Sequence, residues 1–119
     1  MNNIPPKVQN QLAMLQQLQQ QLQTIVGQKA QYEIAVREAK KASEELRDVA
    51  ENAEIFVSVG SVMMQQPKEK VEAQLTEKTE SLELRIKSLE KQEKMLQGKF
   101  EQLQAQIKAA LEGKPPVAT

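Results

Sequence analysis

The sequence contains no cysteine, no histidine and no tryptophan, and its aromatic side chains are one tyrosine and two phenylalanines among 119 residues. Without cysteine and histidine, disulfides, thiol and imidazole catalysis and the common zinc sites are excluded. So few aromatic side chains do not favour a thick globular core. The 16 basic and 16 acidic side chains cancel, so the net charge indicates no attraction to nucleic acid or to an anionic membrane.

Targeting and membrane-spanning patterns are also lacking. The first residues, MNNIPPKVQNQ, have neither the charged start nor the apolar run of a signal peptide. No stretch reaches the roughly 20 apolar residues needed to cross a bilayer. The absence of cysteine is compatible with a reducing compartment. We therefore expect one soluble, cytoplasmic domain over residues 1–119.

A heptad repeat runs along the first third of the chain and predicts a coiled-coil helix over residues 7–51. Pro6 fits a first helical turn, where its missing amide costs nothing, and Asn52 is a candidate left-handed stop. Ten of the thirteen core positions are apolar if alanine and tyrosine are counted. The a positions are Val8, Leu15, Leu22, Lys29, Val36, Ser43 and Ala50, and the d positions are Gln11, Leu18, Ile25, Tyr32, Ala39 and Leu46.

A second and more regular repeat predicts another helix over residues 67–112. Pro67 suits its first turn, and Gly113 before two prolines is a stop, which leaves a flexible tail at 113–119. The d positions are Leu75, Leu82, Leu89, Leu96, Leu103 and Ala110, and the a positions are Thr79, Ile86, Glu93, Phe100 and Ile107. Two arms of near-equal length joined by a short segment predict an antiparallel two-helix coiled coil.

Two of these core positions carry charge, Lys29 and Glu93. If the arms fold back with their inner ends level, residue i lies near residue 118 − i, which brings the two side chains within about a turn of each other. They could then pair and fix the register of the helices. Equally, both long side chains could extend to water.

The segment between the arms, EIFVSVGSVMMQQP, changes character to β-branched, aromatic and methionine side chains around one glycine. It predicts a β-hairpin over residues 54–65 with a type II′ turn at Gly60-Ser61. Alternate residues would place two apolar sets on opposite faces: Ile55, Val57, Val59, Val62 and Met64 on one, Phe56 and Met63 on the other.

Such a hairpin would be marginal alone, because both faces are apolar and both edges are unpaired. Pairing with hairpins from other chains into a closed β-barrel would remove the edges. A continued helix or a simple apolar loop is the alternative.

Residues 8–28 contain no charged side chain, and nine of the twenty-one are glutamine. Leu12 and Met14 fall at e and g positions, outside the predicted seam, so they could present apolar surface. Methionine adapts its shape readily, which suits varied partners. A neutral solvated helix face is the alternative interpretation.

The sequence resembles the prefoldin family, specifically the beta-type subunit found in archaea, over roughly residues 3–112. The resemblance lies in NIPPKVQNQLAMLQQLQQQLQ at the start, AEIFVSVGSVMMQ in the middle and KEKVEAQLTEKTESLELRIKSLEKQEKML in the second arm. The glycine turn inside an apolar hairpin, followed shortly by KEK at the start of a helix, is its most specific part. A single hairpin separates the chain from the longer alpha-type subunit.

The resemblance implies an all-α dominated fold, in which a long antiparallel two-helix coiled coil carries one β-hairpin that joins an intersubunit β-barrel. It implies an ATP-independent holdase without cofactor, built as a hexamer of two alpha-type and four beta-type subunits, which binds unfolded proteins at the coiled-coil tips and delivers them to a group II chaperonin. The assembly residues would be Ile55, Phe56, Val57, Val59, Gly60, Val62, Met63 and Met64. The client-binding tip would comprise Ile4, Val8, Leu12, Met14, Leu15, Ile107 and Leu111.

An adaptor is the second function class, in which a structural coiled coil joins two partners and the hairpin serves only as an oligomerisation clip. It predicts charged e and g positions at the ends of the arms, whereas this chain has a charge-free arm end. An enzyme comes third, because the sequence has no phosphate-binding loop, metal cluster or nucleophile–base set.

Overall fold

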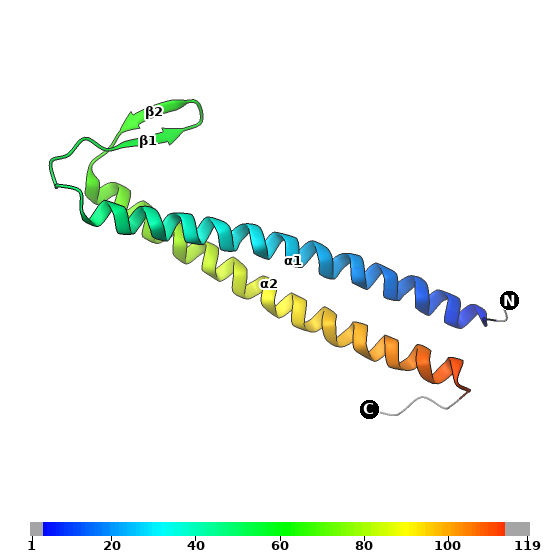
Figure 1. Cartoon of the computed structure of the whole chain (residues 1–119). Helices are drawn as coiled ribbons and strands as arrows, with labels where there is room; N and C mark the ends of the chain where they lie inside the picture. Colours follow the sequence, from blue (N-terminus) through cyan, green and yellow to red (C-terminus); the bar gives the residue numbers. More distant parts are fainter. Residues whose placement is uncertain (1–3, 114–119) are drawn as a thin grey trace. The chain divides into compact units, whose positions relative to one another are not determined.

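The structure is a computed structural model that describes residues 4–113. In chain order its elements are helix α1 (Pro6–Arg47), strand β1 (Phe56–Val59), strand β2 (Val62–Gln65) and helix α2 (Lys68–Leu111) (Figure 1). The chain divides into two compact units, and each is described by itself. The terminal unit comprises residues 4–29 and 88–113, and the hairpin unit comprises residues 30–87.

The terminal unit is a pair of antiparallel helix segments held by a thin apolar seam. Val8 near the start of α1 is 2% exposed and forms one buried cluster with Leu103 and Ile107 near the end of α2. Leu15 and Leu18 pack against this cluster, as the heptad repeat predicts. Ile25 and Leu89 continue the buried seam away from the chain ends.

The two charged core positions meet inside the terminal unit. Lys29 Nζ donates a hydrogen bond of 2.9 Å to Glu93 Oε1, and 21% and 30% of the two side chains remain exposed. Of the two alternatives left open by the sequence, the structure therefore shows the pairing. Because it joins one position on α1 to one on α2, a shift of either helix by a heptad would leave both charges unpaired in the seam.

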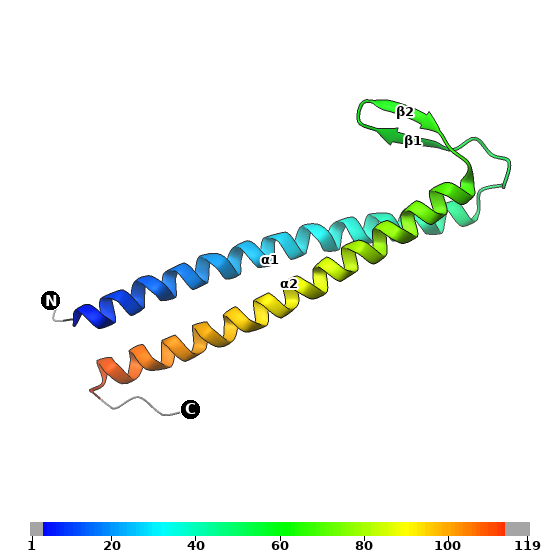
Figure 2. The same cartoon turned by 180° about the vertical axis from the view of Figure 1, so that it is seen from behind.

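The hairpin unit repeats the same antiparallel arrangement. Val36, Ala39 and Leu46 are its buried apolar seam residues on α1. The guanidinium of Arg85 lies over the ring of Tyr32 at 5.9 Å, which is within the range of a cation–π contact. In Figures 1 and 2, which view the molecule from opposite sides, the two helical segments of this unit lie side by side and the hairpin follows α1.

Helix α1 ends at Arg47, four residues before the predicted boundary. The amides of Asp48 and Val49 bond to the carbonyls three residues earlier, at 3.3 and 3.2 Å, which tightens and ends the last turn. No non-glycine residue among the described ones has a positive φ, so the prediction that Asn52 is a left-handed stop is wrong.

Two predicted seam positions also differ from the structure. Ala50 is exposed because it lies beyond the end of α1, and Ala110 is exposed in the last turn of α2. All other predicted a and d residues are buried or half-buried.

Helix α2 begins one residue later and ends one residue earlier than predicted. Gly113 follows it with a φ of 70°, the left-handed conformation that favours glycine after a helix. The rest of the predicted tail, residues 114–119, lies outside the described residues.

Strands β1 and β2 form an antiparallel hairpin, so the alternatives of a continued helix or a simple loop are excluded. Val57 pairs with Met64 and Val59 with Val62, which confirms the predicted division into two faces. Gly60 has a φ of 61° whereas Ser61 has no positive φ, as a type II′ turn requires. A further bond of 2.9 Å from the amide of Gln66 to the carbonyl of Ile55 extends the pairing by one step.

Candidate functional site

The largest set of exposed apolar side chains among the described residues lies on the hairpin. We call this set the hairpin surface; its members are each about half exposed or more, and they are Phe56, Val59, Val62, Met63 and Met64. Val57 is half-buried and completes one face. Burying such side chains would be favourable at about 25 cal/mol for each Å² removed from water.

The two-stranded sheet leaves one edge of each strand unpaired among the residues that the structure describes. Unpaired amides and carbonyls at an edge form hydrogen bonds with any strand laid beside them. Gly60 shapes the end of the hairpin, because its positive φ would strain any other side chain there. The hairpin therefore offers both apolar faces and backbone edges to other strands.

Lys68 connects the two chain segments at the base of the hairpin, and no expectation drawn from the sequence included it. Only 8% of Lys68 is exposed, and its Nζ donates a 2.7 Å hydrogen bond to the carbonyl oxygen of Val49, with carboxylates of Glu72 and Glu51 at 3.7 and 3.8 Å. This contact joins the first turn of α2 to the chain just after α1. The sequence contained a signal, because Lys68 precedes Leu75 by one heptad and so continues the d series.

The predicted tip residues divide into two groups in the terminal unit. Ile4, Leu12, Met14 and Leu111 are exposed, between 38% and 57%. Val8, Leu15 and Ile107 belong instead to the buried cluster or pack against it, so they present little surface of their own. The exposed four are the residues of this set that are free to touch another molecule.

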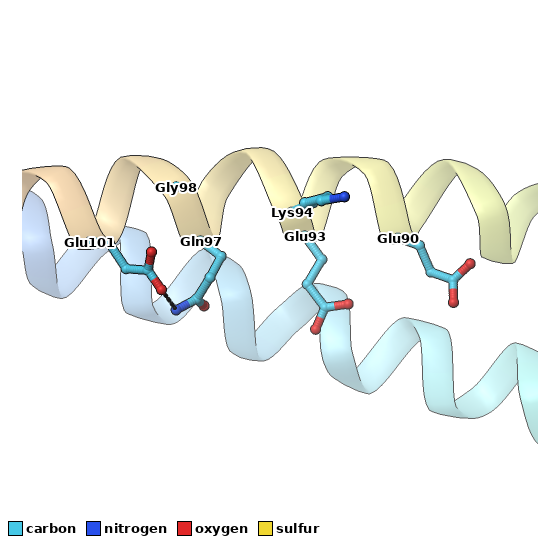
Figure 3. Close-up of a pocket in the computed structure, with 6 residues that line it drawn as sticks. All are labelled: Glu90, Glu93, Lys94, Gln97, Gly98 and Glu101. Carbon is cyan, nitrogen blue, oxygen red and sulfur yellow. Dashed lines mark hydrogen bonds between the residues drawn. The ribbon is translucent and has the colours of Figure 1, made fainter. Parts of the chain in front are cut away.

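The two flanks of the seam in the terminal unit differ in charge. On the e-position flank, a notch of about 490 Å³ is lined by Glu90, Glu93, Lys94, Gln97, Gly98 and Glu101 (Figure 3). Gln97 Nε2 donates a 3.3 Å hydrogen bond to Glu101 Oε1, which Figure 3 marks as a dashed line. The g-position flank carries a groove with no charged side chain in its lining.

The described residues contain no group of three or more acidic side chains placed to hold a metal ion. Within residues 4–113, no helix combines the length and apolar character that crossing a membrane requires. What the hairpin surface and the exposed tip residues can do is bind, through apolar contact and hydrogen bonds.

Residues 9–114 match the model of a protein family described as "Prefoldin subunit". The chain belongs to the prefoldin family. Prefoldin subunits are non-enzymatic components of a chaperone, and that role extends to this chain.

Individual prefoldin relatives indicate which type of prefoldin subunit this chain resembles. "Prefoldin subunit beta" of Methanoculleus marisnigri is 69% identical over 118 residues, with 98% of each chain covered. The protein of the same name from Methanosphaerula palustris is 66% identical, with 99% of each chain covered. The crystal structure of the prefoldin beta subunit from Thermococcus strain KS-1 superposes with a TM-score of 0.85 at 44% identity, covering 98% of this chain and all of that one. The predicted beta type and helix–hairpin–helix fold are thus confirmed.

Proposed function

We propose that this chain is a subunit of an ATP-independent holdase that binds unfolded proteins at its coiled-coil tips and delivers them to a group II chaperonin. The observation that carries the proposal is the match to prefoldin beta subunits over almost the whole chain. A cytoplasmic location is part of the same proposal.

The hairpin is the assembly module in this proposal. Hairpins of several subunits pair edge to edge into a closed barrel, in a hexamer of two alpha-type and four beta-type subunits. The support is an apolar surface that its own unit leaves exposed, together with two unpaired edges. The assembly residues are Ile55, Phe56, Val57, Val59, Gly60, Val62, Met63 and Met64.

In this proposal, unfolded clients bind to the terminal unit at the outer ends of α1 and α2. Direct contact falls to the exposed Ile4, Leu12, Met14 and Leu111. The other three members of the predicted set contribute by holding the helix ends together; Val8 and Ile107 are buried, and Leu15 is half-buried against them. Each contact is weak, and several subunits gripping one unfolded client add their contacts through avidity.

Removal of the tip tests this assignment. Deleting residues 1–15 together with 104–119 leaves the hairpin and the remaining seam in place, so the complex should still assemble. Suppression of the aggregation of a guanidinium-denatured test enzyme, measured by light scattering without nucleotide, should fall sharply. A truncated complex that protects the enzyme as well as the full-length one would place client binding elsewhere and would leave room for the adaptor function.

Point substitutions provide the matched control. Leu12→Ser with Met14→Ser should weaken protection partially, because other tip residues remain. Ile34→Ser with Leu84→Ser removes two similarly exposed apolar side chains from the hairpin unit and should leave protection unchanged. If both pairs reduce protection equally, binding follows total apolar surface and not the tip.

A further inference from the structure

The g-position flank of the terminal unit holds a groove of about 610 Å³ with a neutral lining. Its polar side chains come from both helices, and they are Gln17, Gln20, Gln21, Thr24 and Gln92. Ile25 and Leu96, two d-position residues of the seam, supply its apolar part. Met14 lies one heptad before Gln21, so it occupies the same g row and is exposed.

The hydrogen-bonding groups in this groove are the same as those of a peptide backbone. Each glutamine amide has two N–H donors and one carbonyl acceptor. Within residues 4–113, no side chain or backbone group bonds to the amides of the four glutamines. Thr24 Oγ1 donates to the carbonyl of Gln20 at 3.0 Å and keeps its lone pairs as acceptors. The polar groups of the groove are therefore available to a ligand.

Because the groove has no charged side chain, it does not select ligands by their charge. The notch on the e-position flank presents carboxylates and a lysine, which attract or repel a ligand according to its charge. The groove contains no ionisable group, and α1 has none from Val8 to Gln28. A ligand held there is selected by hydrogen-bonding pattern and by apolar contact, not by charge.

We propose that this groove binds the main chain of an extended, non-native polypeptide, with a client side chain resting on the half-buried Leu96. The proposal deepens the proposed function and rests on it. The backbone is the one feature that all unfolded proteins share, and in the unfolded state its N–H and C=O groups lack partners within the chain. Amide side chains that pair with it hold clients regardless of sequence, which apolar tip residues alone do not.

The test compares two forms of one probe. The probe is a capped, neutral ten-residue peptide of Ser, Thr, Ala and Leu with a fluorophore at one end, and its second form is N-methylated at alternate residues. N-methylation removes backbone donors and keeps every side chain. Fluorescence anisotropy with the assembled full-length complex gives a dissociation constant for each form. The unmethylated peptide should bind about tenfold more tightly, as expected from the loss of one or two hydrogen bonds.

Gln17→Leu with Gln21→Leu is the decisive variant, because leucine keeps helix propensity and adds apolar surface but removes two of the four amides. It should lose most of the preference for the unmethylated peptide, and it should bind that peptide more weakly than the parent does. The matched control, Gln16→Leu with Gln23→Leu, changes two exposed b-position glutamines outside the groove and should keep the tenfold preference. Circular dichroism checks that all three are equally helical.

A groove variant that keeps the full preference overturns the proposal, and so does a parent that binds both peptides equally or neither of them.

Failure of the proposed function gives a different combination of results in the two assays. If the tip substitutions Leu12→Ser and Met14→Ser abolish protection of the denatured enzyme while the groove variant keeps its peptide preference, the groove is excluded and the chaperone function stands. If the parent complex does not suppress aggregation at all, the chaperone function itself fails.

Discussion

Lys29 and Glu93 show how a single pair of residues specifies which helix faces lie together. An ion pair that is mostly withdrawn from water adds modest stability, because desolvation offsets much of the attraction. Removing one partner of the pair lowers stability, because the other charge is then left without its partner in the seam. The pair is therefore better understood as a determinant of register than as a source of stability.

A charge cycle tests this role. Glu93→Lys places two lysines against each other in the seam and should lower the free energy of unfolding by about 1–2 kcal/mol. Lys29→Glu combined with Glu93→Lys restores opposite charges and should recover most of the loss. Urea unfolding followed by circular dichroism measures both.

The exposed pair of Lys40 Nζ and Glu83 Oε2, 3.5 Å apart with about half of each side chain in water, is the matched control. Glu83→Lys should cost at most about 0.5 kcal/mol, since exposed ion pairs contribute little. Equal costs at the two sites would contradict a special role for the seam pair.

At the scale of elements, the helices and the hairpin are predictable from the sequence because their signals are local. A heptad of leucines marks the buried face of α2, and a glycine flanked by alternating apolar residues sets the hairpin register. The predicted end of α1 is wrong because the heptad pattern continues to Ala50, whereas the amides of Asp48 and Val49 bond to carbonyls three residues earlier and end the helix at Arg47.

The candidate sites were less predictable than the elements. The seven tip residues came from a family resemblance that does not distinguish seam from surface. Val8 and Leu15 already stood at a positions of the heptad, and the structure buries both or packs them against the core cluster. The amide groove needs side chains from both helices, so no single stretch of sequence reveals it.

The hairpin as an assembly element can be tested without unfolding the coiled coil. Val57→Lys with Val62→Lys puts two like charges on one face of the hairpin, where burial against another strand would cost several kcal/mol per charge. The variant should stay helical by circular dichroism yet fail to form the complex in size-exclusion chromatography.

Asn52→Lys with Ser61→Lys adds the same charge at exposed positions outside both strands and should assemble normally. A full-sized complex from the valine variant would show that another surface joins the subunits.

At the scale of the whole molecule, each chain carries one hairpin surface and one terminal unit, and in the proposed hexamer both act together with those of other chains. An apolar hairpin without a partner promotes association or aggregation. The isolated chain should therefore self-associate, and addition of an alpha-type subunit should produce a six-subunit species with four copies of this chain. Native mass spectrometry of the chain alone and of the mixture gives both compositions directly. A mixture that stops at one-to-one pairs would contradict the hexamer.

The charge-free run along α1 also determines where specific proteases can cleave this helix. Trypsin cuts after lysine and arginine, so after Lys7 its next site is Lys29, and Glu33 is the first acidic residue for a glutamate-specific protease. Tryptic digestion after cross-linking to a client would return residues 8–29 as one peptide, which contains the α1 residues of both the tip and the amide groove. Locating a bound client along α1 requires a protease that cuts after leucine or methionine.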